Sequence, residues 1–133
     1  MNVVPQIVNA LVAPTLMILA LSLAQPSMAG DHGGGGGPEP LVFTVNLGKE
    51  NYLQFGLILE TATPDAAGAL AAYKPRIQHQ IILLLSGKEV DNLRTLEGKK
   101  KLIGDIVELA NHVIHEDEET GVKEALFTRF LIQ

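Results

Sequence analysis

The chain contains 133 residues, of which 47% are hydrophobic, 19% are charged and 5% are aromatic. This length leaves room for one average domain once an apolar leader and a glycine run are set aside. The formal net charge of -5 argues against nucleic acid as a partner, because affinity for phosphates depends on an excess of Lys and Arg. The absence of cysteine excludes disulfides and thiolate metal sites, and the scarcity of aromatic residues predicts an aliphatic core of Leu, Ile, Val and Ala.

The first 30 residues form a separate compositional zone, because they contain no Asp, Glu, Lys or Arg. Residues 7–24 are apolar enough to enter a bilayer, although a spanning helix needs about 20 residues. Small residues at Ser27 and Ala29 follow Pro26, as they do at a signal-peptidase site, and no basic residue precedes the apolar run. We therefore expect export to the periplasmic side, with residues 1–30 acting either as a transmembrane anchor or as a cleaved signal peptide.

Residues 31–40, DHGGGGGPEP, are expected to be a flexible linker. The consecutive glycines disfavour both helix and strand, because ordering glycine has a large cost in backbone entropy. A coil of about ten such residues has a root-mean-square span of roughly 17 Å. A phosphate-binding loop would require a strand before the glycines and a helix after them, and neither is expected here. The sequence therefore predicts one folded domain over residues 41–133.

Two strands are expected to open this domain. Residues 41–47 and residues 53–60 both alternate with a period of two, which is typical of a strand with one buried face. The residues between them, 48–51, have turn chemistry. We expect a hairpin whose apolar face carries these side chains: Leu41, Phe43, Val45, Leu47, Leu53, Phe55, Leu57 and Leu59.

Two helices are expected next. Thr63 is a suitable N-cap and Pro64 suits the first turn, so a helix is predicted from there through the alanine-rich residues 66–73. Pro75 is expected to interrupt it. A second helix is then predicted over residues 76–86, with its apolar side chains at helical spacing: Ile77, Ile81, Leu84 and Leu85.

A longer helix capped by Thr95 is expected to follow. Its apolar stripe is formed by Leu102, Ile103, Ile106, Leu109, Ala110 and Val113. Its water-facing side is expected to carry Lys100, Lys101, Asp105 and Glu108. Residues 115–121 form an acidic loop, and residues 122–133 are rich in β-formers and predict a closing strand. This order indicates an α+β fold, with helices covering one face of a largely antiparallel sheet.

Few residues suggest a catalytic or metal-binding role. His112 and His115 precede four consecutive acidic residues, a composition that could hold a divalent metal, but their spacing matches no established ligand pattern. A solvated helix end with an acidic loop is the favoured interpretation. His79 is expected on the polar side of its helix, His32 lies in the linker, and the basic run 99–101 is expected to be a solvated helix face. No nucleophile elbow, acid–base pair or His-Glu helix motif occurs, so no catalytic residue, metal, cofactor or small-molecule substrate is predicted.

Several segments, read together, resemble the family of the flagellar basal-body protein FliL. They follow one another in order across nearly all of residues 41–133. The segments are FTVNL at 43–47, the strand that opens with Tyr52-Leu53 and runs through Leu59-Glu60, Pro75-Arg76-Ile77 leading into IILLLS at 81–86, TLEGK at 95–99, and the closing FTRFLIQ at 127–133.

The resemblance implies a single-pass protein of the bacterial inner membrane, held by residues 7–24, with a periplasmic domain similar to SPFH or stomatin-type domains. It also implies a homo-oligomeric ring around the MotA/MotB stator that supports torque, swimming or swarming. The family has no catalytic residues, so the resemblance implies a protein that is not an enzyme. The alternative is a soluble periplasmic binding or chaperone-like module, released by signal-peptide cleavage, that shares the fold without joining the motor.

Overall fold

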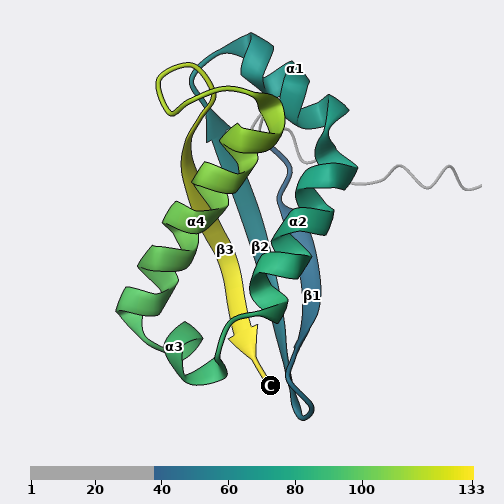
Figure 1. Ribbon diagram of the computed structural model, residues 1–133, viewed down its shortest axis with the longest axis vertical. Helices are drawn as coiled ribbons and strands as arrows, with labels where there is room; N and C mark the ends of the chain where they lie inside the picture. The colour runs from purple at the N-terminus through teal and green to yellow at the C-terminus, as the bar shows by residue number, and fades with distance from the viewer. Residues whose placement is uncertain (1–37) are drawn as a thin grey trace, which may run out of the picture. The chain divides into compact units, whose positions relative to one another are not determined.

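The computed structural model describes residues 38–133. Residues 1–37 therefore lie outside the described residues. They include the predicted apolar segment 7–24, the predicted signal-peptidase site at Ser27 and Ala29, and most of the predicted linker with His32. Within 38–133, no helix is both long enough and apolar enough to cross a bilayer. The elements, in chain order (Figure 1), are β1 (Leu41–Leu47), β2 (Asn51–Thr61), α1 (Pro64–Ala72), α2 (Lys74–Ser86), α3 (Val90–Arg94), α4 (Leu96–Ile114) and β3 (Val122–Ile132).

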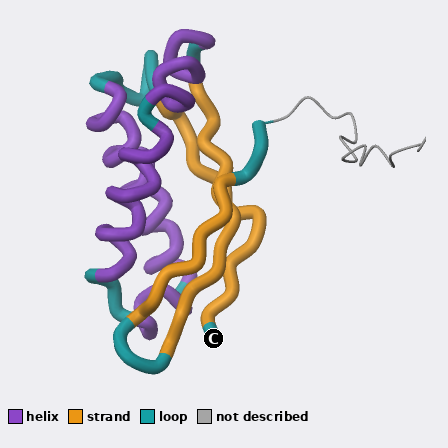
Figure 2. The backbone as a smooth tube through the Cα atoms, turned by 90° about the vertical axis from the view of Figure 1, so that its right-hand side faces the viewer, coloured by secondary structure: helices purple, strands orange, loops and turns teal. Residues whose placement is uncertain are grey.

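The three strands form one antiparallel sheet in the order β1-β2-β3. β1 pairs with β2 from Leu41 opposite Leu57 to Leu47 opposite Asn51. β2 pairs with β3 as far as Thr61 opposite Val122, with two register shifts. The helices all lie on the same side of the sheet (Figure 2). The predicted α+β fold, with helices on one face of an antiparallel sheet, is confirmed.

The alternation of apolar side chains in β1 and β2 sets which face of the hairpin is buried. Phe43, Val45 and Leu47 are buried on the helix side of β1, whereas Val42 points to the other side and is exposed. The turn between the strands contains Gly48 with φ of 68°, a conformation that costs glycine little because it has no Cβ. The predicted hairpin is therefore confirmed.

The core is mainly aliphatic, as predicted, but it also contains aromatic rings. All four phenylalanines of the chain gather on the helix side of the sheet, where the rings of Phe43 and Phe55 stack with centroids 4.7 Å apart. Phe127 meets Phe55 edge to face at 5.7 Å, and Phe130 lies 5.0 Å from Phe127. A low aromatic content does not prevent clustering, because strand alternation places the few rings of three strands on the same face.

The two helices after β2 differ from the prediction at their junction. Thr63 caps α1 as expected, and its Oγ1 accepts the Ala66 N–H at 3.2 Å. Pro75, however, does not delay α2, which begins at Lys74. Proline is tolerated in the first turn because its missing N–H would have no helical partner there. A short helix, α3, also forms between α2 and α4 where no helix was predicted.

The long helix α4 packs its apolar stripe on the core as predicted. Thr95 caps it, accepting the Gly98 N–H at 2.9 Å. The stripe is wider than expected, because Val107 and Ile114 are also buried. Asp105 is an exception to the predicted water-facing side, because its carboxylate is half-buried between two lysines.

A buried asparagine joins α4 to β3. The side chain of Asn111 accepts the N–H of Val122 at 2.7 Å and donates to the C=O of Val122 at 2.8 Å. Both main-chain groups of the first residue of β3 are thus satisfied inside the protein, where an unpaired amide would be costly. This pair of bonds sets where β3 starts against the helix layer.

Candidate interaction surfaces

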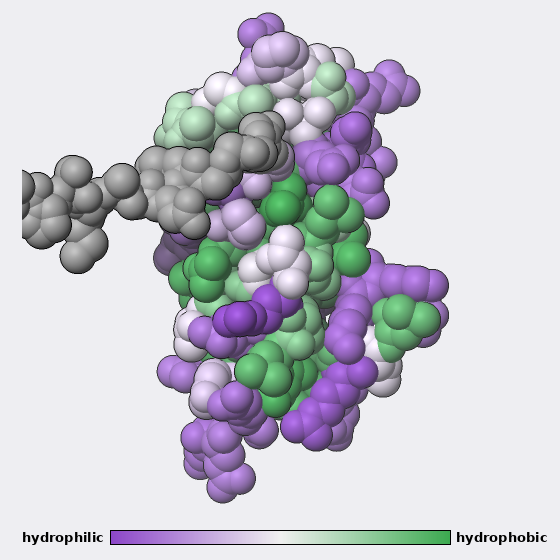
Figure 3. Space-filling model, turned by 180° about the vertical axis from the view of Figure 1, so that it is seen from behind, coloured by the Kyte–Doolittle hydropathy of each residue, from purple (hydrophilic) through white to green (hydrophobic). Residues whose placement is uncertain are grey.

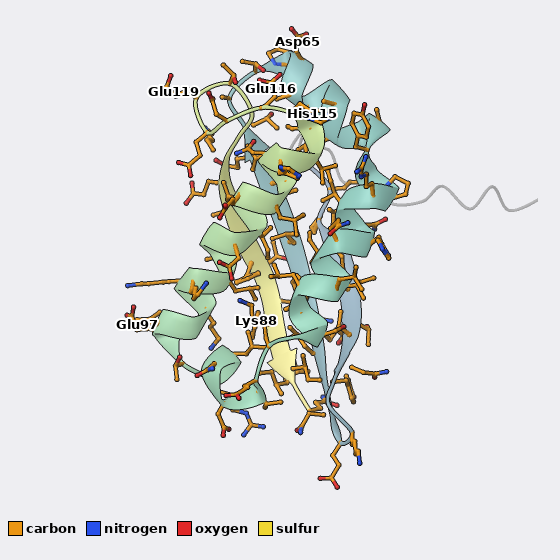
Figure 4. The ribbon with its side chains drawn as sticks, in the orientation of Figure 1. Asp65, Lys88, Glu97, His115, Glu116 and Glu119 are labelled. Carbon is orange, nitrogen blue, oxygen red and sulfur yellow. The ribbon has the colours of Figure 1, made fainter. Side chains whose placement is uncertain are left out.

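The two histidines considered as metal ligands lie at the C-terminal end of α4. His112 is exposed in the last turn, and His115 is the C-cap, with a left-handed φ of 61° and its N–H bonded to the C=O of Asn111. Figure 4 shows His115, Glu116 and Glu119 at this end of the molecule, the end that also carries Asp65 at the start of α1. The residues are therefore near each other in the fold, but they belong to a solvated turn.

The acidic side chains of this turn mainly stabilise the turn itself. Asp117 accepts the N–H groups of Glu119 and Thr120 at 2.9 and 3.0 Å, and Glu116 accepts the Thr120 hydroxyl. The hydrogen bonds from Thr120 lower the pKa of Asp117. Over residues 38–133, the structure has no group of three or more His, Cys, Asp or Glu placed to hold a metal ion. His79 is exposed on α2.

The basic run 99–101 is occupied by contacts within the domain. The ammonium of Lys99 lies 5.3 Å from the ring centroid of Phe130. Lys100 lies 3.9 Å from Glu97, and Lys101 bonds Asp105 at 2.8 Å. These contacts fit the interpretation of the run as a helix surface rather than a phosphate-binding patch.

Asp105 is the centre of a small charge cluster. It accepts hydrogen bonds from Lys101 on its own helix and from Lys88 in the loop after α2. Partial burial raises the pKa of Asp105, but the hydrogen bonds and positive charges of Lys101 and Lys88 outweigh burial and hold this pKa below its usual value. Figure 4 shows Lys88 within the helix layer, whereas Glu97 points outward from α4. The cluster ties the α2–α3 loop to α4.

The face of the sheet opposite the helices carries exposed apolar side chains. Strand register places Val42 of β1, Tyr52 and Ile58 of β2, and Leu126 and Leu131 of β3 on this side. Val42 is 68% exposed, and hydrophobic side chains gather across the middle of this face (Figure 3). The sequence pattern placed Val42 opposite the predicted apolar face of the hairpin, and it assigned no face to the side chains of the closing strand. Their apolar identity in the sequence was the signal that could have identified this second apolar face.

A cleft of about 560 Å³ opens at the end of the domain where β1 begins. Its walls come from the end of β2, from α1 and from the first turn of α2, and its rim includes Pro38, Glu39 and Leu41 at the start of β1 and Lys123 of β3. The sequence reasoning missed this cleft. It lies where β2, with 11 residues, extends beyond the start of the 7-residue β1.

A comparison with known families matches residues 40–133 to the model of the flagellar basal body-associated protein FliL. The chain belongs to the FliL family. The matched region coincides with the folded domain from just before β1 to the last residue, so the predicted resemblance is confirmed. FliL-family proteins are flagellar structural proteins rather than enzymes.

Two curated relatives show the level of sequence identity between this chain and other FliL proteins. The flagellar protein FliL of Escherichia coli strain K12 is 31% identical over 93 residues, covering 68% of this chain and 60% of the relative. FliL of Aquifex aeolicus is 30% identical over 94 residues, covering 68% of this chain and 56% of the relative. The alignment therefore spans somewhat more than half the length of these relatives.

Proposed function

We propose that this chain is a flagellar scaffold that supports swimming and swarming by forming a ring around the MotA/MotB stator. Its support is the family match, which covers the whole folded domain and names a basal body-associated protein. A scaffold protein acts through the surfaces by which it contacts its neighbours. The exposed apolar sheet face, with β1 and β3 as open edges of the three-stranded sheet, offers the kind of surface that a neighbouring copy covers.

The domain organisation is part of the same proposal. Residues 1–30 act as the inner-membrane anchor or a signal peptide, residues 31–40 as the linker, and residues 41–133 as the periplasmic domain, which we compare with SPFH-type domains. Heterologous contacts between identical domains close a ring, and the linker lets each domain reach its neighbour above the membrane. In the alternative, the leader is cleaved after Ala29 and the domain is a soluble periplasmic binding or chaperone-like module. The cleft beside β1 favours this second candidate.

A chromosomal deletion tests the motor assignment. We expect the deletion strain to swarm less and to swim more slowly in viscous medium, because the motor loses a support under load. The full-length chain should restore both, whereas residues 31–133 exported by a cleavable signal should not. Normal motility of the deletion strain under high load would remove the assignment.

Sequencing of the mature N-terminus separates the two candidates, because a chain that begins at Gly30 has no anchor.

A further inference from the structure

The edge of β2 that faces β1 is only partly used. β1 begins at Leu41, opposite Leu57, whereas β2 continues to Thr61. The residues before β1, Pro38 to Pro40, are not part of the sheet, and their two prolines have no N–H to donate. Among residues 38–133, the end of the strand, residues 58–61, therefore has a neighbour in β3 on one side and no strand on the other.

The alternation of main-chain groups shows which atoms face the open side. Tyr52 exchanges two hydrogen bonds with Gln133 at 2.7 and 3.0 Å, so the N–H and C=O of the even-numbered residues of β2 point toward β3. Ala62 follows the same rule, because its N–H donates to the C=O of Gly121. The main-chain groups of Leu59 and Thr61 must then point toward the open side.

Two further observations agree with this direction. Val122, opposite Thr61, has both main-chain groups occupied by Asn111, so it does not bond Thr61. In the described part of the chain, no residue before β1 makes a main-chain hydrogen bond to Leu59 or Thr61. The open edge therefore presents two N–H donors and two C=O acceptors.

The cleft lies directly beside this open edge. Leu59, Glu60 and Thr61 line it on the β2 side, and α1 and α2 form the opposite wall. Pro38 and Glu39, which precede β1, line its rim without joining the sheet. Its apolar lining comprises Leu41, Leu59, Ala67, Leu70, Ala71 and Ile77. The volume of about 560 Å³ is ample for a branched aliphatic side chain that enters from a strand laid along the edge.

Charges at the cleft define the occupant further. Glu60 pairs with Lys123 at 3.7 Å, so these two charges largely satisfy each other. Glu39, also exposed, lies at the rim before β1. Lys74, exposed at the start of α2, has no ion pair among residues 38–133. In a strand, alternate side chains share a face, so an acidic residue two positions from the aliphatic one lies on the helix side, where Lys74 is.

We propose that this edge and cleft form a peptide-binding site that works by strand addition. The occupant is an extended segment of a partner protein, which pairs with Leu59 and Thr61, inserts a branched aliphatic side chain into the cleft and presents an acidic side chain to Lys74. The chain's own linker lines the cleft through Pro38 and Glu39, but none of its residues carries a branched aliphatic side chain that could be inserted. The inference is independent of the motor assignment.

Two capped, fluorescently labelled peptides test the site, Thr-Leu-Thr-Glu-Thr and its reverse, which cover both strand directions. Each is titrated into the full chain in detergent, with binding followed by anisotropy and by hydrogen exchange of residues 57–62. We expect at least one peptide to bind and to slow exchange in that segment. The same peptide with N-methylated amides should not bind, because it cannot form the main-chain bonds. Absence of protection with both peptides, or equal binding of the N-methylated form, overturns the proposal.

Two matched variants distinguish binding at this site from nonspecific binding of the peptide. Ala71→Trp fills the cleft from an exposed position of α1, and Ala72→Trp places the same side chain at the next exposed position, outside the cleft. Only the first should weaken binding, by at least about tenfold, since it removes the aliphatic contact. Lys74→Glu should weaken binding roughly fivefold and be rescued by a peptide with Lys in place of Glu. Equal effects of the two Trp variants, or self-association that Ala71→Trp abolishes without peptide, would contradict a partner peptide as the occupant.

Discussion

At the scale of single residues, a few polar side chains inside the domain decide its geometry. Asn111 is the buried polar residue of the described core, 5% exposed, and both of its bonds go to the main chain of Val122. The close packing around it involves Gly121 as well, because a Cβ there would lie 2.3 Å from the Asn111 Oδ1. A helix pattern alone suggests that position 111 is a solvated asparagine, whereas its partner is the strand that starts after the acidic turn.

Replacement of Asn111 tests this bridge. Asn111→Ala should lower the free energy of unfolding by about 2 to 3 kcal/mol, because it leaves a buried N–H and C=O of Val122 unpaired. Urea denaturation of the full chain in detergent measures the change. His112→Ala is the control, since that side chain is exposed and should change stability by less than about 0.5 kcal/mol. Similar stabilities of the two variants would show that the bridge contributes little.

The charge cluster at Asp105 predicts a pH dependence. The pKa of Asp105 in the folded protein lies below its unfolded value of about 3.9. Its carboxylate therefore contributes stability above that pH, and the contribution is lost as pH falls through the folded pKa. Asp105→Asn should lower stability at pH 7 by about 1 kcal/mol or less, and the difference from the native chain should shrink in acid. Glu97→Gln, which removes an exposed pair on the same helix, should show no such trend in denaturation measured against pH.

At the scale of elements, the junction between α3 and α4 depends on a close approach of backbone. Thr95 bonds the C=O of Asn92 through its N–H and its hydroxyl, which brings the end of α3 against the first turn of α4. Gly98 faces this contact, and a Cβ there would lie 1.7 Å from the Asn92 carbonyl oxygen. Gly104, farther along the same helix, has open space where a Cβ would lie, with no contacting atom within 4 Å.

Two alanine substitutions on α4 should therefore act in opposite directions. Gly104→Ala should stabilise the protein by about 0.5 to 1 kcal/mol, because alanine is the better helix former and nothing obstructs it. Gly98→Ala should destabilise it by about 1 to 3 kcal/mol, because α3 must move away. Thermal unfolding followed by circular dichroism compares the two. Stabilisation by both would mean that the α3–α4 contact is loose.

At the scale of the whole molecule, one face of the sheet is covered by helices and the other is partly apolar and uncovered (Figures 2 and 3). The covered face contains the phenylalanine cluster and the aliphatic stripes of α2 and α4. The uncovered face has no comparable partner among the described residues. A scaffold protein needs such a surface, and the proposed ring supplies a neighbour for it.

Charge introduced on the uncovered face tests whether it serves the proposed assembly. Val42→Glu should leave the free energy of unfolding within about 1 kcal/mol of native, because Val42 is 68% exposed. It should nevertheless reduce the oligomer mass in detergent and the swarm diameter of a complemented deletion strain. Leu96→Glu is the matched control, an equally exposed apolar residue at 65% on α4. Equal oligomer mass and motility for Val42→Glu and the native chain would show that this face is not the contact.

Much of the local structure was predictable, because it depends on short-range patterns. Alternation over residues 41–47, the caps at Thr63 and Thr95, and the apolar stripe of α4 each place an element correctly. The family resemblance rests on the same segments. The start of α2 was placed two residues too late, because Pro75 was interpreted as an interruption and not as a first-turn residue. The helix over residues 90–94 was missed, because a short helix held by its neighbours has a weak local signal.

The sequence by itself determined the class of the domain, the strand faces and the lack of a recognisable catalytic motif, since periodicity and motif spacing are properties of the chain. Tertiary structure alone decided which distant groups meet. It brings Asn111 to Val122 and Lys88 to Asp105, and it leaves the end of β2 open beside a cleft. These features depend on how strands of unequal length and separate helices pack against one another, and no local pattern in the chain encodes such long-range contacts.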